Sequence, residues 1–459
     1  MTTLFADFAL LPTGWERDVE VVVEADGRIG SVTPGVNATD IETDLRLTGR
    51  VLLPSPPNLH SHTFQRAMAG MTEARGPSGR DSFWTWRDLM YRFLDRLTPE
   101  DIETIAALAF VEMLEAGYAS VAEFHYLHHP VGGGRYHDPG ETSTRIAAAA
   151  AASGIGLTHL PVLYTRGGVD DRPLEGGQRR FGSDFATFDT VCNSAAHAID
   201  SLPDARLGVA AHSLRAVTQG DLARLAAERA GDPFHIHIAE QVAEVEAVEA
   251  SYGARPVAWL FQSLPVDRHW CLIHATHLSD GEVRGIAESG AVAGLCPVTE
   301  ANLGDGVFRG AEFAARDGAL GVGTDSNIRI DLAEELRQLE YSQRLARRER
   351  SVMATPDQST GRWLFQQVCA GGAQALGRDA GRIEPGAWAD LLTLDRTDLA
   401  LAGLDGDALL DAWVVCGDKS AIRDVWSAGR HVVREGRHIA REPIELRYRQ
   451  TIAELRSAL

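Results

Sequence analysis

Short apolar runs alternate with amphipathic stretches rich in alanine, arginine, glutamate and leucine over most of the chain. The runs predict strands at residues 49–54, 119–124, 157–164, 207–212, 234–238, 270–275, 291–297 and 319–325. Strands that alternate with helices favour a parallel sheet, and eight such repeats predict an α/β fold, a closed TIM-like (β/α)8 barrel. In nearly every repeat a polar residue stands at or just after the end of the run, where barrel enzymes place their catalytic groups.

Both ends of the chain have a different, β-rich pattern. An apolar run at residues 19–24 is followed by an Asp26-Gly27 turn, and further strand-like runs lie at residues 390–394, 412–415 and 424–433. We expect residues 1–50 and 381–440 to form one small composite β-sandwich, with the barrel at 51–380 and a charged amphipathic helix at 441–459. The alternative is two unrelated β fringes.

Composition and charge narrow the classes of partner. Of the 459 residues 44% are hydrophobic and 24% charged, which is typical of a soluble globular protein. We expect no membrane span, because no run of eighteen apolar residues occurs, and no secretory signal. The formal net charge of -20 argues against nucleic acid or an anionic membrane as the main partner. The five cysteines are scattered, which favours reduced thiols in the cytoplasm.

Ligand-type side chains stand at the ends of four predicted strands. His60 and His62 are two residues apart in an extended segment, so both imidazoles point the same way and can bind one ion. A second pair, His235 and His237, is followed by Glu240, while His274 and Asp325 end two later strands. In a barrel these ends converge at one mouth. The alternative is that these are structural histidines with satisfied hydrogen bonds.

This pattern resembles the amidohydrolase superfamily, over about residues 50–400 and in the composite β module. The resemblance implies that His60, His62, His237 and Asp325 bind one divalent ion, with zinc favoured over iron, cobalt or manganese. His235 competes with His237, but the spacing of Glu240 after His237 fits the aminohydrolase branch. The only lysine, Lys419, lies outside the predicted barrel, which excludes the lysine-bridged binuclear site of other members.

The resemblance also implies roles in catalysis. A metal-activated water is the expected nucleophile. Asp325 is expected to accept a proton from it, His274 to orient or stabilise it, and Glu240 to carry a proton to the departing nitrogen.

Residues 58–67, 84–91, 122–126 and 212–217 are similar to a subfamily, the formimidoylglutamate deiminases. This similarity implies hydrolysis of N-formimino-L-glutamate, a small dicarboxylate amidine, to N-formyl-L-glutamate and ammonia in histidine degradation, by a homodimer. We expect Arg87 and Arg215 to clamp the substrate carboxylates. Gln65 and Tyr126 are expected to donate further hydrogen bonds, and His212 to contact either end of the substrate.

Other residues and two other functions stay open. His125, His128, His129 and His137 look like a metal cluster but lie in a glycine-rich loop, so we expect a substrate loop at most. Trp84 and Trp86 either wall the pocket or pack the loop that carries them, and Glu300 and Asn302 are expected to line the pocket. A deaminase of a ring amine would show aromatic stacking residues instead of two arginines. A metal-free scaffold or binding protein would lack at least one ligand.

Overall fold

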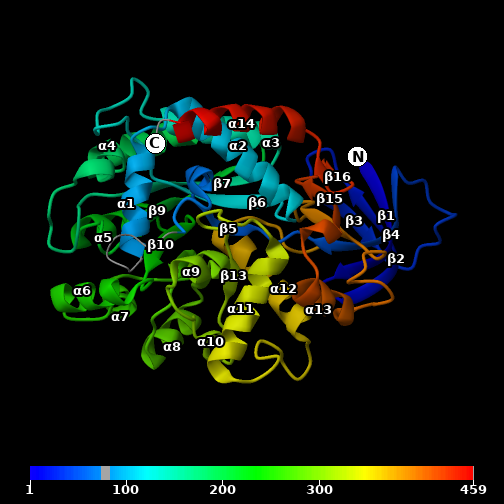
Figure 1. Ribbon diagram of the computed structural model, residues 1–459. Helices are drawn as coiled ribbons and strands as arrows, with labels where there is room; N and C mark the ends of the chain where they lie inside the picture. The colour runs from blue at the N-terminus through cyan, green and yellow to red at the C-terminus, as the bar shows by residue number, and fades with distance from the viewer. Residues whose placement is uncertain (74–82, 458–459) are drawn as a thin grey trace.

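The computed structural model describes residues 1–73 and 83–457 (Figure 1). Within this part of the chain, eight parallel strands follow one another around a barrel. They are β5 (Asn58–Ser61), β6 (Ser120–His125), β7 (Gly156–Leu163), β9 (Val209–Ser213), β10 (Phe234–Ile238), β11 (Trp270–His274), β12 (Val292–Leu295) and β13 (Leu320–Val322). A parallel bridge between Ser61 and Asp325 joins the last strand to the first. The predicted (β/α)8 barrel is confirmed.

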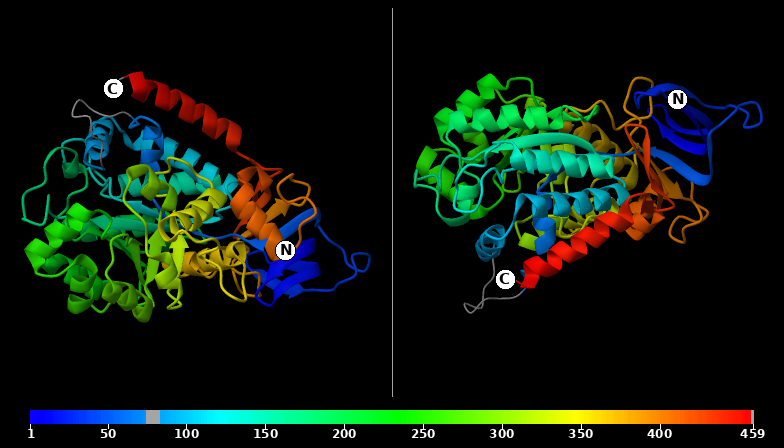
Figure 2. Two further views of the ribbon diagram at one scale, coloured as in Figure 1. Left: turned by 60° about the horizontal axis from the view of Figure 1, so that its bottom comes forward. Right: turned by 90° about the horizontal axis from the view of Figure 1, so that it is seen from above.

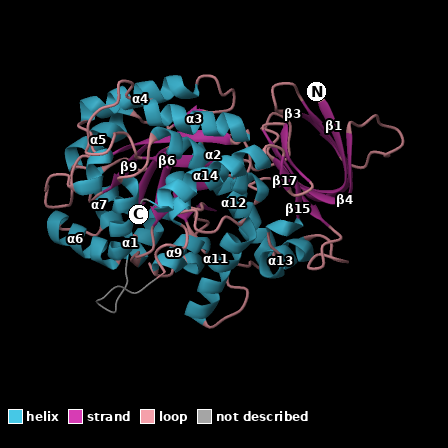
Figure 3. Ribbon diagram, turned by 45° about the horizontal axis from the view of Figure 1, so that its top comes forward, coloured by secondary structure: helices cyan, strands magenta, loops and turns pink. Residues whose placement is uncertain are grey.

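Helices surround these strands, as Figure 3 shows. The main ones are α1 (Phe83–Leu94), α2 (Pro99–Glu115), α3 (Glu141–Ser153), α4 (Phe185–Ile199), α5 (Gln219–Glu228), α6 (Val242–Tyr252), α7 (Pro256–Ser263), α8 (Asp280–Ser289), α9 (Pro297–Leu303), α10 (Gly310–Ala314), α11 (Leu332–Arg347) and α12 (Thr360–Leu376). Several begin at residues whose side chains cap the first turn. Thr98 and Ser279 form capping boxes with Asp101 and Glu282, which satisfy amide groups that the helix leaves open.

The two chain ends form a single sheet of eight strands beside the barrel. Its order is β17 (Arg437–His438), β16 (Arg430–Arg434), β15 (Ile422–Ser427), β14 (Leu391–Asp395), β4 (Leu45–Pro54), β1 (Thr2–Leu11), β2 (Gly14–Val23) and β3 (Ile29–Thr33). Neighbours are antiparallel except for β1 and β4. The composite β module is therefore confirmed, and the two ends are not unrelated fringes.

The terminal sheet is buried on both faces. On β1, Leu4 and Ala6 belong to a small core that the sheet encloses with Trp426, whereas Phe8 and Leu10 belong to the barrel core. The change of face comes from an irregularity in the strand, because the register of β1 on β4 shifts between Ala6 and Phe8, and beyond it Ala9 and Leu11 face the small core. The sheet therefore holds itself together and is fixed to the barrel at the same time.

Two predicted strands were wrong in place or type. Residues 49–54 are not the first barrel strand but the end of β4, whose Val51, Leu52 and Leu53 are apolar because both faces of that sheet are covered. We propose that the barrel begins after Pro54 and not at the predicted residue 51. Residues 412–415 lie in α13 (Asp407–Cys416), where burial of Leu409, Leu410, Trp413 and Val414 follows a helical period.

The C-terminal segment forms α14 (Arg441–Ser457), which packs along α2 (Figure 2). Its Ile452 and Leu455 are buried, while most of its other residues are exposed or half-buried. Among the described residues, no helix combines the length and apolar character needed to cross a membrane.

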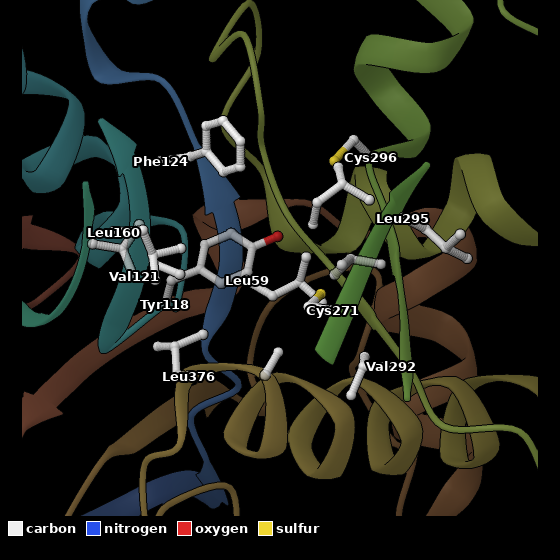
Figure 4. Packing of buried hydrophobic residues seen from close by; sticks show 14 of the residues in the cluster. Leu59, Tyr118, Val121, Phe124, Leu160, Cys271, Val292, Leu295, Cys296 and Leu376 are labelled. Atoms are coloured by element: carbon white, nitrogen blue, oxygen red, sulfur yellow. The ribbon is translucent and has the colours of Figure 1, made fainter. Parts of the chain in front are cut away.

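The barrel interior below the site is tightly filled (Figure 4). Leu59 of β5 is fully buried with Val121, Leu160, Cys271 and Leu295. A Cβ atom placed on Gly321 would lie 2.5 Å from the Leu59 Cδ2 atom, and one on Gly294 would lie 3.0 Å from Cδ1. The two strand glycines therefore make room for this leucine, directly before the residue that begins the predicted metal site.

Candidate active site

The four predicted metal ligands meet at the mouth of the barrel. His60 is the last residue but one of β5, and His62 directly follows that strand. His237 lies on β10, and Asp325 comes shortly after β13. The Nε2 atoms of His60 and His237 are 3.0 Å apart. Asp325 Oδ1 lies 3.5 Å from His60 Nε2 and 3.4 Å from His62 Nε2. All four side chains are buried.

Hydrogen bonds fix the orientation of two of these imidazoles. His62 Nδ1 donates to the carbonyl oxygen of Phe124, and His237 Nδ1 donates to that of His212, each at 3.0 Å. With the proton on Nδ1, each Nε2 atom presents a lone pair to the centre of the cluster. Burial lowers the pKa of His62 to about 3 and the pKa values of His60 and His237 well below the usual value, so all three are neutral.

This donor set fits a divalent metal ion. Neutral imidazoles and a carboxylate are the forms that bind metal, and one ligand atom from each of His60, His62 and His237 lies within 4.8 Å of the other two. His235 is not part of the cluster, because its Nε2 lies 2.8 Å from the carbonyl oxygen of Ala375 in α12.

Glu240 and His274 stand beside the ligands. His274 Nε2 lies 3.9 Å from Glu240 Oε1 and 3.9 Å from Asp325 Oδ2. Burial raises the pKa of Glu240 to about 7, although the charges of His274 and Arg215 oppose this. Burial lowers the pKa of His274, but three acidic side chains outweigh burial and raise this pKa to about 10. They are Glu240, Asp325 and Glu300, and Glu300 also accepts a hydrogen bond from His274 Nδ1. The site thus pairs the Glu240 carboxyl group, whose pKa is close to neutral pH, with the protonated imidazole of His274.

Backbone conformation at these strand ends is unusual. His274 has φ = +68° and Asp325 has φ = +44°, and Ala239, directly before Glu240, has φ = +53°. Residues other than glycine adopt this left-handed region at a cost, and such residues cluster at functional sites. These positions stand at or just after the ends of β10, β11 and β13, where Glu240, His274 and Asp325 lie.

Glu300 has a place that the sequence did not predict. It lies on α9 behind His274 and is not among the described residues that line the pocket. Its Oε1 accepts hydrogen bonds from His274 Nδ1 at 3.2 Å and from the backbone amide of Cys296 at 2.8 Å. Asn302 likewise lies outside this lining, and its Nδ2 donates to Glu73 Oε1 at 3.0 Å. Sequence spacing cannot reveal the contacts with His274 and Glu73, because these partners are 26 and 229 residues away along the chain.

The predicted substrate residues line one pocket with the metal ligands and Glu240. These residues are Gln65, Arg87, Tyr126, His212 and Arg215. Gln65 Nε2 donates to the Tyr126 hydroxyl at 2.9 Å, and the Arg87 guanidinium lies 5.6 Å from the centroid of the Tyr91 ring. Arg215 Nη2 lies 3.8 Å from Glu240 Oε2. Five side chains from four separate parts of the chain therefore lie in one pocket.

The pocket also has a wall of aromatic residues, most of which the sequence did not single out. Trp86, Tyr91, Tyr126, Tyr164 and Phe181 line it. Tyr164 stands directly after β7, so the strand-end signal that found the other residues applies to it as well. Trp86 was an open alternative and lies at the pocket, while the side chain of Trp84 is outside the described residues.

The histidines of the glycine-rich loop form no common centre. His125 Nε2 lies 2.9 Å from Thr142 Oγ1, His128 Nε2 lies 3.1 Å from the carbonyl oxygen of Val162, and His129 Nε2 lies 2.9 Å from Ser183 Oγ. None of them is among the described residues that line the pocket, and His137 is exposed. These buried histidines hold the loop after β6 to its neighbours.

Comparisons with known proteins agree with this geometry. The family model "Amidohydrolase family" matches residues 51–432, and "Formimidoylglutamate deiminase HutF, N-terminal domain" matches residues 1–42. The formimidoylglutamate deiminase of Pseudomonas aeruginosa is 49% identical over 99% of this chain and 100% of its own length. An amidohydrolase structure from Brucella melitensis superimposes with a TM-score of 0.94, at 46% identity over 99% of this chain and 100% of that one.

A more distant structure shares the fold. An adenosine deaminase from Xanthomonas campestris with bound zinc has a TM-score of 0.83 and 21% identity, over 99% of this chain and 98% of that one. The same barrel and terminal sheet thus occur in proteins with different substrates.

Proposed function

Because the chain belongs to the amidohydrolase family and to its formimidoylglutamate deiminases, we propose that it hydrolyses N-formimino-L-glutamate to N-formyl-L-glutamate and ammonia. This reaction belongs to histidine degradation. The observation that carries the proposal is the placement of two arginines, Arg87 and Arg215, in one pocket with Glu240 and the metal-ligand cluster. A substrate with two carboxylates and one amidine head needs those two kinds of group in one cavity.

The two arginines bind the substrate carboxylates. A guanidinium can form two parallel hydrogen bonds to a carboxylate, and such charge-assisted bonds are roughly twice as strong as neutral ones. The dianion approaches a protein of net charge -20, so this local positive charge also offsets an unfavourable field. Gln65, Tyr126 and His212 donate further hydrogen bonds and set the orientation of the chain between the carboxylates.

His60, His62, His237 and Asp325 hold one divalent ion, which we propose to be zinc. When bound, such an ion lowers the pKa of water so that water becomes a nucleophile near neutral pH. The proposal of a single ion is supported by the lack of a bridging lysine. Lys419 is the only lysine in the sequence, and it begins the short helix Lys419–Ala421 outside the barrel, so it is not placed to bridge two metal ions.

The chain's own residues manage the protons. Water adds to the formimino carbon and Asp325 takes the proton it loses. His274, protonated and held by Glu300, donates a hydrogen bond to the added oxygen. Glu240 delivers its proton to the terminal nitrogen, takes the proton held by Asp325 and delivers that proton to the same nitrogen. The bond from carbon to this nitrogen then breaks and ammonia leaves, while the hydroxyl proton of the intermediate returns to Glu240 and the carbonyl of N-formyl-L-glutamate forms. A pKa of about 7 suits Glu240 to both accept and release a proton near neutral pH.

The products test this assignment. Zinc-loaded protein incubated with N-formimino-L-glutamate is expected to release ammonia and N-formyl-L-glutamate in a ratio of one to one. Formation of formamide and glutamate would mean that the other carbon–nitrogen bond breaks, and would contradict the proposed proton delivery. Absence of any product would contradict the function itself.

The aromatic wall favours a second candidate, a deaminase of a ring amine such as guanine, adenosine or a pterin. Several rings of the aromatic wall, however, pack edge to face on one another or on histidines. The ring centroids are 4.7 Å apart for Tyr126 and Phe181, and also for Tyr164 and His212. Rings engaged in this way are less suited to stack on a base, and a ring amine leaves both arginines without a carboxylate. We therefore place this candidate second.

We also propose that the protein works in the cytoplasm as a homodimer. All five cysteines lie in the described part of the chain, where each is a free thiol, which supports a reducing compartment. The homodimer rests on the family resemblance alone.

A further inference from the structure

Glu244 is a buried carboxylate next to the site that has no place in the mechanism above. It lies in the first turn of α6 and its side chain has no exposed surface. Its Oε2 accepts a hydrogen bond from the backbone amide of Glu240 at 3.1 Å. Its Oε1 lies 4.0 Å from Arg215 Nε. One side chain therefore contacts the residue that moves the proton and approaches the one that binds a carboxylate.

Arg215 requires a permanent negative neighbour. Its side chain is 16% exposed, and an isolated cation at such a depth is costly. Among the residues that the structure describes, the carboxylates of Glu240 and Glu244 lie within 4.0 Å of the guanidinium. Glu240 cannot serve this purpose throughout the reaction, because it changes its protonation. Glu244 can, because it takes no part in the proposed proton transfer and its Oε2 is held by the backbone amide of Glu240.

We propose that Glu244 is a positioning residue that couples the carboxylate clamp to the proton shuttle. It holds the backbone at Glu240 and keeps Arg215 from closing onto the Glu240 carboxylate. Arg215 then remains available to the substrate, and Glu240 remains available to the departing nitrogen. The inference rests on the proposed function for its kinetic readout only.

Glu244→Gln is the sharpest test, because the amide keeps an acceptor for the Glu240 backbone and loses only the charge. Glu246 lies on the exposed face of the same helix, so Glu246→Gln is the matched control. We expect E244Q to raise KM for N-formimino-L-glutamate by about tenfold, because Arg215 now pairs with Glu240 and the substrate must compete for it. E246Q should match the wild type.

A double-mutant cycle with Arg215→Met separates coupling from general destabilisation. Once Arg215 is gone, E244Q should change KM by less than about twofold, since the charge has lost its partner. A merely structural role would give similar effects with and without Arg215, and this additivity would overturn the proposal. If E244Q does not fold, Glu244→Ala takes its place in the cycle, and Glu244→Asp, which keeps the charge, is expected to raise KM less than the variant without it.

A crystal structure of zinc-loaded E244Q tests the same idea without substrate. Arg215 is expected to move into direct contact with Glu240, within about 3 Å. An unchanged Arg215 position would reject the role of Glu244. Wild-type protein that is inactive on N-formimino-L-glutamate, in contrast, would reject the proposed function and leave this structural result standing.

Discussion

At the scale of single residues, the site depends on a few side chains whose ionisation is set by burial. Glu240 is the central example, because its buried position raises its pKa to about 7 while Arg215 and His274 limit that rise. The three imidazoles are kept neutral by the same burial. Metal binding and proton delivery to the departing nitrogen are therefore proposed for different residues, and substitution of Glu240 should separate the two.

Glu240→Gln is expected to lower kcat by about 10²- to 10⁴-fold, because an amide cannot deliver the proton to the departing nitrogen. Zinc content should stay at one ion per chain, because Glu240 is not a ligand. Turnover assays and metal analysis on the same preparation check both parts. Retained activity would remove Glu240 from the proton path.

Arg87→Met is expected to raise KM for N-formimino-L-glutamate by about 10- to 100-fold, with a smaller change in kcat, because a charge-assisted hydrogen bond to the substrate is lost. Arg92 is exposed on the same helix, so Arg92→Met controls for the loss of a positive charge from α1. Steady-state kinetics of the wild type, R87M and R92M test whether Arg87 binds a substrate carboxylate. Equal KM values for R87M and R92M would reject the clamp.

At the scale of elements, the strand ends were predictable and the contacts behind them were not. The ends of β5, β10, β11 and β13 carry the expected polar residues, because a parallel barrel directs every strand end to one face. Glu300 was expected to line the pocket, but its contact with His274 and that of Glu244 with Arg215 could not be predicted, because tertiary packing sets both. The run at 49–54 was misplaced because a strand covered on both faces looks the same in a barrel and in a sheet.

Buried histidines near the packing of β6 and β7 against α3 predict that the protein loses stability at acidic pH. Burial lowers the pKa values of His128 and His159 to about 3, and that of His125 well below normal. An unfolded histidine has a pKa near 6.5. Below that pH the unfolded chain therefore binds more protons than the folded chain does, and the free energy of unfolding falls. Each such group should cost up to about 1.4 kcal/mol of stability per pH unit between pH 6.5 and its folded pKa.

Thermal unfolding at pH 7.5 and pH 5.5 checks this. Between these values Tm should fall, and His159→Gln should reduce the fall because one proton-binding group is removed from the unfolded state. His197→Gln, at an exposed position on α4, is the control. An H159Q protein whose Tm falls as steeply as that of H197Q would contradict the role of this cluster.

At the scale of the whole molecule, the barrel and the terminal sheet form one support for the site. The sheet is anchored through residues such as Phe8 and Leu10, which share the barrel core. The protein has a net charge of -20, so the pocket arginines provide local positive charge within a molecule that is negative as a whole. The (β/α)8 fold and the composite module were both predictable, because they depend on periodicity and not on particular contacts.

Removal of the metal should affect stability as well as activity. Dialysis against a chelator is expected to abolish ammonia release and to lower Tm, because an ion that binds only the folded state stabilises it by about 4 kcal/mol at a thousandfold excess over its Kd. Added zinc should restore both. Full activity in protein that metal analysis shows to be free of ions would contradict the ligand assignment of His60, His62, His237 and Asp325.

The measurement that tests the central claim most directly is kcat/KM for ammonia release by the zinc-loaded protein across N-formimino-L-glutamate, N-formimino-L-aspartate, guanine, adenosine and cytosine. We predict the highest value for N-formimino-L-glutamate, a lower one for the shorter dicarboxylate, and little release from the three ring amines. Release from a ring amine alone would keep the fold and the metal site but contradict the carboxylate clamp of Arg87 and Arg215.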